Sequence, residues 1–138
     1  MKTAVDTSIL LDVFGADPEH GERSRVALRG AYRAGALVAC DVVWAEVRAH
    51  FPRQTDFREV LGLLGVRFDA TSADAATLAG RLWRAHRTRS GARRPRVMAD
   101  FLIGAHAKMQ ADALLTRDRG FYRDYFVGLR VVDPTRAP

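Results

Sequence analysis

The chain has a single cysteine, Cys40, among its 138 residues, so no intrachain disulfide can form. Its cysteine usage therefore gives no sign of an oxidising compartment. Asp6 and Asp12 interrupt the apolar residues near the N-terminus, which excludes the hydrophobic segment of a secretory signal peptide. No stretch approaches the roughly 18 apolar residues of a membrane span. We therefore expect a cytoplasmic protein without a membrane partner.

Two nucleotide-binding signatures are also missing. The chain contains neither a GxGxxG pattern nor a Gly-Lys-Ser/Thr loop, which disfavours the nucleotide-binding folds that depend on them. A phospho-acceptor receiver domain would carry a lysine after its last strand, and residues 129–133 contain none. The sequence also lacks internal repeats and a linker between two halves. We therefore expect one domain that spans residues 1–138.

Lysine is scarce, since only Lys2 and Lys108 occur, and arginine supplies nearly all of the positive charge. Lysine and arginine together number 22 against 16 acidic residues, which gives a net charge of +6. The planar guanidinium group suits bidentate recognition of phosphate, and a basic surface favours a polyanionic partner. A general compositional bias towards arginine and alanine explains the same excess. The charge alone therefore does not distinguish a polyanionic partner from such a bias.

Apolar periodicity predicts alternating strands and helices. Short strands are expected at residues 2–5, 37–40, 66–68, 113–116 and 129–132. Helices are expected at residues 7–14, 18–35, 54–64, 97–110 and 118–125. Two more helices are expected, from residue 41 to before Pro52 and from residue 72 to an arginine-rich segment at 87–96. In helix 18–35 the expected core contacts are Val26, Leu28 and Tyr32. This order predicts an α/β domain with a mostly parallel five-stranded sheet sandwiched by helices.

Four carboxylates lie among apolar residues: Asp6, Glu46, Asp100 and Asp118. Asp6 and Asp118 lie at or just past the carboxyl ends of predicted strands, which meet at one rim of a parallel sheet. Glu46 and Asp100 lie in predicted helices, each in phase with apolar residues. Glu46 shares a face with Val43, Val47 and His50, and Asp100 shares one with Val97, Ile103 and Gly104. We therefore expect both side chains to point towards the protein rather than away from it.

Converging carboxylates repel one another unless a cation neutralises them, and oxygen ligands suit Mg²⁺ or Mn²⁺. Simpler roles remain open: Asp6 and Asp118 as helix N-caps, Glu46 as a rim residue reaching solvent, and Asp100 as a structural residue. Glu46 and His50 are spaced so that both could reach one metal, but we expect the histidines to be structural. Other acids, including Asp12, look like solvated charges.

At these acids the chain resembles a known family. The motifs are Val5-Asp6-Thr7-Ser8, Glu46 after an apolar run, residues 99–107 (ADFLIGAHA) and residues 115–121 (LTRDRGF). In this order they resemble the successive motifs of PIN-domain ribonucleases, and most of all those of VapC toxins from toxin–antitoxin pairs. The likeness spans nearly the whole chain, and it implies a single PIN-like domain.

The resemblance implies a metal-dependent endoribonuclease that hydrolyses RNA phosphodiester bonds. Asp6, Asp100 and Asp118 would then hold Mg²⁺ or Mn²⁺, and Glu46 would complete the catalytic acidic pocket. Thr7, Ser8 and Thr116 match supporting hydroxyl positions, and they also fit cap or strand-end roles. The resemblance further implies a small antitoxin partner and a homodimer.

We expect arginines near these acids to contact the RNA backbone. They belong to the arginine-rich segment or to the fourth motif, and they are Arg93, Arg94, Arg96, Arg117 and Arg119. For any one of them, a solvated basic surface remains the alternative. The alternative for the whole protein is a metal-stabilised, PIN-like module that binds RNA without cleaving it.

Overall fold

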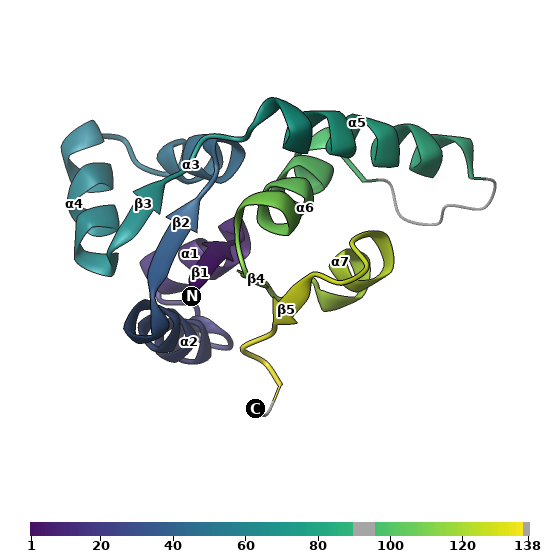
Figure 1. Ribbon diagram of the computed structural model, residues 1–138. Coiled ribbons are helices and arrows are strands. Elements are labelled where there is room, and N and C mark those ends of the chain that lie inside the picture. Colours follow the sequence, from purple (N-terminus) through teal and green to yellow (C-terminus); the bar gives the residue numbers. More distant parts are fainter. Residues whose placement is uncertain (90–95, 137–138) are drawn as a thin grey trace.

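A computed structural model describes residues 1–89 and 96–136. The strands are β1 (Lys2–Val5), β2 (Ala36–Ala39), β3 (Val66–Phe68), β4 (Ala113–Leu115) and β5 (Arg130–Val132). The helices are α1 (Thr7–Phe14), α2 (Gly21–Ala34), α3 (Asp41–Arg48), α4 (Gln54–Leu64), α5 (Ala73–Thr88), α6 (Met98–Gln110) and α7 (Arg119–Tyr125). Figure 1 shows their arrangement. The predicted α/β order is confirmed.

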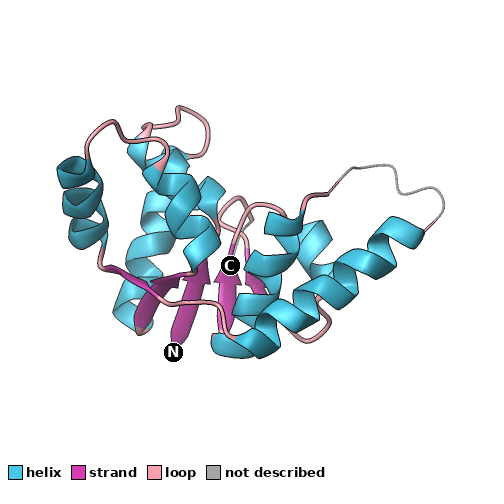
Figure 2. Ribbon diagram, turned by 90° about the horizontal axis from the view of Figure 1, so that it is seen from above, coloured by secondary structure: helices cyan, strands magenta, loops and turns pink. Residues whose placement is uncertain are grey.

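The five strands form one sheet in the order β3-β2-β1-β4-β5, and every neighbouring pair is parallel. The sheet is thus wholly rather than mostly parallel, as Figure 2 shows from above. The chain runs outward from β1 to β3 and then returns to the other side of β1 to form β4. A topological switch point therefore lies between β1 and β4, and open parallel sheets bind ligands at the carboxyl ends of strands beside such a point.

Helices cover the sheet because each parallel connection must cross over it. Right-handed crossovers place the β1–β2 and β2–β3 connections on one face and the later connections on the other. In agreement, α2 contacts β2, whereas α6 contacts β1 and β4. Helix α5 packs along α6 on its outer side, as Figure 1 shows.

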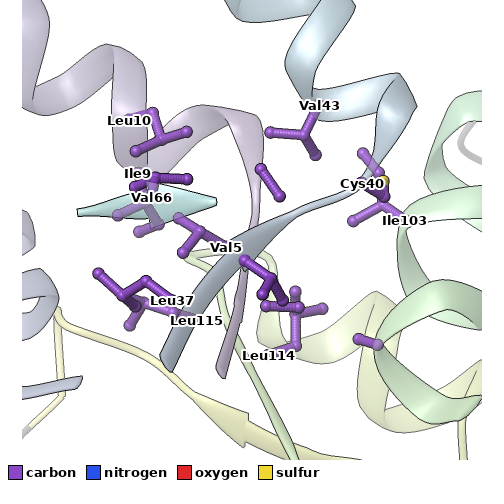
Figure 3. Close-up of a cluster of buried hydrophobic side chains, with 14 of the residues drawn as sticks. Val5, Ile9, Leu10, Leu37, Cys40, Val43, Val66, Ile103, Leu114 and Leu115 are labelled. Atoms are coloured by element: carbon purple, nitrogen blue, oxygen red, sulfur yellow. The ribbon is translucent and has the colours of Figure 1, made fainter. Parts of the chain in front are cut away.

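The core lies between the sheet and these helices (Figure 3). Val5 and Leu114 from the central strands are at most 1% exposed, and Ile9 from α1 is fully buried. Cys40 is 1% exposed and belongs to the same cluster, as expected of a thiol that behaves as a small apolar side chain. The rigid packing of β1 and β4 fixes the positions of the residues that follow each strand.

The second helix differs from the prediction. It begins at Gly21 rather than near residue 18, because Asp17 accepts hydrogen bonds from the backbone of Glu19 and His20 in a preceding turn. Leu28 is buried as expected, but Val26 and Tyr32 are 58% and 57% exposed. The apolar residues of α2 thus extend beyond the face of the helix that is buried. In the part of the chain that the structure describes, no helix is long and apolar enough to span a membrane.

Candidate active site

Asp6 follows the last residue of β1 and is 9% exposed. Its Oδ1 accepts a 2.7 Å hydrogen bond from the backbone amide of Thr7, so the N-cap alternative is confirmed for this residue. Its Oδ2 accepts a 2.6 Å hydrogen bond from the Thr116 hydroxyl, which comes from the end of the neighbouring β4. Asp6 therefore caps α1 and also faces the switch point.

Thr116 connects the first and fourth acids. It is fully buried, and its backbone amide extends the β4–β5 pairing by donating to Val132. Besides donating to Asp6, its Oγ1 accepts a 3.0 Å hydrogen bond from the backbone amide of Asp118. The supporting role expected of Thr116 thus has a geometric basis. Asp118 holds the N-cap position of α7, but its side chain makes no capping bond, so the cap alternative is wrong for this residue.

Asp100 lies in the first turn of α6, and its side chain is 28% exposed. Its Oδ2 accepts a 3.3 Å hydrogen bond from the backbone amide of Val97, the residue before the helix. Val97 itself is 61% exposed, so it is not part of a buried face with Asp100 as the helical phase suggested. The buried neighbours on this side of α6 are Ile103 and Gly104, where the Phe126 ring lies against the glycine.

Arg96 lies between the third and fourth acids. Its Nη1 and Nη2 donate to the two carboxylate oxygens of Asp118, the second at 3.3 Å, and Nη1 lies 4.0 Å from Oδ2 of Asp100. The guanidinium carbon stands 4.2 Å from the centre of the Phe121 ring. We expected this arginine to face RNA, but here it neutralises the acidic residues of the chain itself.

Glu46 is exposed, whereas Val43 and Val47 on either side of it in α3 are buried. The expectation that its side chain points inward with those residues is wrong, because the carboxylate lies at the edge of the buried face. Its Oε1 accepts a 2.7 Å hydrogen bond from the hydroxyl of Thr7, which adjoins Asp6. Glu46 is thereby placed at the same rim as the other acids. The Ser8 hydroxyl donates to none of the four acids within the described residues.

The electrostatics of Asp6 show that three of the acids are near neighbours. Burial raises the pKa of the Asp6 carboxyl from 3.8 to about 6. The hydrogen bonds from Thr116 and Thr7 oppose this shift, and the charges of Asp100 and Asp118 add to it. The ionised form of an acid that is buried beside two other acids costs stability unless a positive partner compensates its charge.

Tyr122 is a site residue that the sequence analysis missed. It is 1% exposed, and burial raises the pKa of its phenol well above the usual value. The charges of Asp6, Asp100 and Asp118 raise this pKa further, which places all three carboxylates near one ring. Tyr122 lies four residues after Asp118, so the helical phase of α7 was the signal that could have identified it.

Asp12 was expected to be a solvated charge, but it is 5% exposed. It accepts two hydrogen bonds from Arg117, at 2.8 and 3.0 Å, and one from Ser24 at 2.9 Å. Arg117, which we expected to contact RNA, is therefore engaged in a bidentate ion pair. The ion pair joins α1 to the segment that carries Thr116 and Asp118, and the Ser24 hydrogen bond joins α2 to the same carboxylate.

The remaining arginines divide into two groups. Arg93 and Arg94 lie outside the described residues. Arg119 is exposed and lines a groove of about 790 Å³ between α2 and the chain at and after β5. It is the one expected RNA-contacting arginine among the described residues that takes part in no ion pair there.

Two histidines make hydrogen bonds away from the acids. His106 is 1% exposed, and its Nε2 lies 2.8 Å from Oδ2 of Asp69. His86 Nδ1 contacts the hydroxyl of Tyr125. His50, four residues after Glu46, is exposed. The positions of His86 and His106 agree with the structural roles expected of them, and the role of His50 stays a prediction.

The donor set fits a hard divalent cation in its chemistry, because Asp6, Asp100 and Asp118 are neighbouring acids that offer only oxygen atoms. In the present side-chain positions, however, no three Asp, Glu, His or Cys side chains of residues 1–89 and 96–136 are placed to hold one ion. Both oxygens of Asp118 are bonded to Arg96 instead. The three carboxylates are thus near neighbours, and one of them is fully engaged by a guanidinium group.

Comparison with solved structures shows that this fold recurs in toxin–antitoxin proteins. The structure of VapBC2 from Rickettsia felis bound to a promoter DNA fragment matches with a TM-score of 0.72 and 17% identity, over 96% of this chain and 98% of the other. VapBC-1 from nontypeable Haemophilus influenzae matches with a TM-score of 0.71 and 20% identity, over 99% and 100%. The sarcin-ricin loop cleaving toxin VapC20 from Mycobacterium tuberculosis matches with a TM-score of 0.58 and 17% identity, over 93% and 98%.

No sequence among curated proteins matches the chain. The model of one protein family does match, and it covers residues 3–126. This range includes all four acids, β2, β3, β4 and all of β1 except Lys2. The chain belongs to the PIN domain family.

Proposed function

We propose that this chain is a metal-dependent endoribonuclease, that residues 1–138 act as one nuclease domain, and that it is the toxin of a toxin–antitoxin pair. The observation that carries the proposal is the proximity of Asp6, Asp100 and Asp118, which is close enough for their charges to act on one another. Asp6 follows β1, Asp100 lies in α6, and Asp118 lies between β4 and α7. The charges of Asp100 and Asp118 raise the pKa of Asp6. Three carboxylates that repel one another in this way are typical of a site at which a bound cation neutralises their charge.

Asp6, Asp100 and Asp118 would hold Mg²⁺ or Mn²⁺, directly or through water. A divalent ion held by these residues would supply a nucleophilic water at neutral pH and would stabilise charge on the phosphoryl and leaving oxygens. The surrounding residues orient the ligands: the Thr116 hydroxyl fixes Oδ2 of Asp6, and the Thr7 amide fixes Oδ1. Glu46, which the Thr7 hydroxyl holds at the rim, is placed to orient a water molecule beside the ion.

The groove beside α2 is the proposed path of the RNA backbone. Arg23, Arg119, Arg130 and Arg136 all line it. Its two acids, Glu22 and Asp133, are each already engaged by an arginine, Glu22 by Arg25 at 2.7 Å and Asp133 by Arg136 at 3.9 Å. Arg119, which lines the groove, directly follows Asp118, and this supports a path by which a strand bound along the groove would reach the acids.

Two protein partners belong to the proposal. Several of the similar structures are VapBC or FitAB assemblies, and one is described as a toxin–antitoxin complex from Klebsiella pneumoniae. We accordingly propose a small antitoxin as the cognate partner and a homodimer as the form in solution. Co-purification with the product of the adjacent reading frame would test the first, and sedimentation equilibrium of the isolated chain would test the second.

The central experiment is RNA cleavage by the purified chain with Mn²⁺ or Mg²⁺ and with excess chelator. Asp100→Asn keeps the size of the side chain but removes the charge that would hold an ion, so cleavage should fall at least a hundredfold with little change in thermal stability. Asp74→Asn is the matched control, because Asp74 is exposed in the first turn of α5, which packs outside α6. Full cleavage in chelator would overturn the metal-dependent mechanism.

A non-cleaving RNA-binding module is the second candidate, since the arginine-lined groove favours binding with or without chemistry. Retention of labelled RNA and its cleavage, measured on the same samples of wild type and Asp6→Asn, separate the two candidates. A nuclease predicts that the variant retains RNA but does not cleave it. Retention by both proteins, without cleavage by either in the presence of metal, would establish the binding module.

A further inference from the structure

Arg96 is the most confined arginine near the acids. Its side chain is 16% exposed, and the guanidinium lies against the Phe121 ring at 4.2 Å. The two nitrogen atoms at its end donate to both oxygens of Asp118, and one of them lies 4.0 Å from Asp100. A planar guanidinium that is stacked on a ring and paired with a carboxylate at two points has a defined position.

We propose that Arg96 is the internal counter-ion of the acidic site, and that a divalent ion binds only by displacing it from Asp118. This inference rests on the proposed function, because it assumes that Asp6, Asp100 and Asp118 are metal ligands. It assigns Arg96 a role in setting the metal affinity of the chain. Arg96 and the ion would then compete for the same carboxylates.

The first argument is the occupancy of the ligand atoms. Both oxygens of Asp118 accept hydrogen bonds from Arg96, and those are the atoms that an ion would coordinate. Among the described residues no three potential ligands are placed to hold an ion while this pair is formed. Breaking the Arg96–Asp118 pair would free both oxygens.

The second argument is charge. A guanidinium close to Asp100 and Asp118 would stand beside any ion that these two residues bind, and two cations at such a separation repel each other strongly in a partly buried site. The pair and the ion therefore exclude each other. It follows that the metal-free protein is stabilised by Arg96, and that its metal affinity is lower than the three carboxylates alone would provide.

The test measures the binding of Mn²⁺ to the metal-free chain by isothermal titration calorimetry. Arg96→Gln removes the competing charge and should lower the dissociation constant for Mn²⁺ at least tenfold, while the melting temperature without metal falls. Arg96→Lys keeps the charge but loses the two-point contact and the stacking. The affinity of this variant for Mn²⁺ should therefore lie between those of wild type and Arg96→Gln. This second variant also covers the case in which Arg96→Gln folds poorly.

Arg123→Gln is the matched control. Arg123 is exposed on α7, the helix that carries Phe121, and it pairs with Asp124 rather than with the site. Its removal changes the net charge equally and should leave the dissociation constant within about threefold of the wild-type value.

The outcomes separate the two proposals. Tighter binding by both Arg96 variants supports the counter-ion role. If wild type and Arg96→Gln bind Mn²⁺ with equal affinity, or the variant binds more weakly, the counter-ion inference is overturned and the metal-dependent function stands. If no variant binds Mn²⁺ or Mg²⁺ at millimolar concentration, both the inference and the metal-dependent mechanism fail.

Discussion

The Thr116 hydroxyl donates a 2.6 Å hydrogen bond to Oδ2 of Asp6 across 110 positions of the sequence. The bond joins the ends of two neighbouring parallel strands at the switch point of the sheet. Since the same hydroxyl accepts from the Asp118 amide, one buried atom sets the positions of two of the proposed metal ligands.

Thr116→Val should therefore weaken both stability and metal binding. Valine fills nearly the same volume but leaves a buried carboxylate oxygen without its donor, at a cost of about 1–3 kcal/mol. We expect the free energy of unfolding to fall by that amount at pH 8, where Asp6 is charged, and the dissociation constant for Mn²⁺ to rise several-fold. Denaturant unfolding and calorimetry would measure the two quantities.

Thr77→Val is the control, because the Thr77 hydroxyl donates to the Ala73 carbonyl on an exposed part of α5. It should leave Mn²⁺ binding unchanged. Equal metal affinity in wild type and Thr116→Val would show that the hydroxyl does not position Asp6.

The raised pKa of Asp6 predicts a specific dependence of stability on pH. Because the folded pKa, about 6, lies above the ordinary value of 3.8, the folded state holds its proton more tightly than the unfolded chain does. The stabilisation is complete below about pH 4 and is lost as the pH rises through 6. Above pH 7 the buried charge costs about 3 kcal/mol, at 1.36 kcal/mol per pKa unit.

Asp6→Asn should consequently stabilise the metal-free protein at pH 8 by about 2 kcal/mol, since the loss of one hydrogen bond offsets part of the gain. Near pH 4 the variant should be no more stable than wild type. Thermal unfolding across this range, with chelator present, measures the difference. A variant that is less stable at every pH would show that the Asp6 charge is well compensated without metal.

The helical and strand patterns were sufficient to predict the fold and the placing of Asp6 and Asp118. Both follow buried strands, and the carboxyl ends of parallel strands meet at one rim whatever the details of packing. The side chain of Glu46 was misplaced, because a helical face has a boundary that periodicity alone does not locate. The same uncertainty explains Val26 and Tyr32, which are apolar but lie beyond the buried stripe of α2.

Pairs of distant charges could not be predicted from the sequence. Asp12 looked solvated because its partner, Arg117, lies 105 positions away and becomes its neighbour only in the folded sheet. The proximity of Arg96 to Asp100 follows from their spacing of four residues, but the stronger pair with Asp118 spans 22 positions. For both arginines, their place in an arginine-rich or basic motif suggested RNA contact, whereas the structure pairs them with acids.

Arg117→Ala should destabilise the protein far more than a surface arginine variant does. It would leave Asp12 charged at 5% exposure with only the Ser24 hydroxyl as a side-chain partner, and breaking a buried pair typically costs about 3–5 kcal/mol. Because Arg117 is itself 29% exposed, we expect the lower end, about 3 kcal/mol, in denaturant unfolding. Asp12→Ala combined with Arg117→Ala should recover part of the loss, since no unpaired charge remains. Destabilisation below about 1 kcal/mol would show that water solvates Asp12 in the variant.

The groove beside α2 makes a prediction about salt. Each phosphate contact with single-stranded RNA contributes roughly 0.7 to the slope of log affinity against log salt concentration. Arg119→Gln combined with Arg130→Gln removes two groove arginines that form no ion pair among residues 1–89 and 96–136. The slope should thus fall by about 1.4, and RNA should bind several-fold more weakly at low salt, with thermal stability unchanged.

Arg81→Gln combined with Arg84→Gln, on the distant helix α5, removes the same charge and should leave the slope nearly constant. If both double variants lower the slope equally, RNA responds to the net charge of the chain and the groove is not its path.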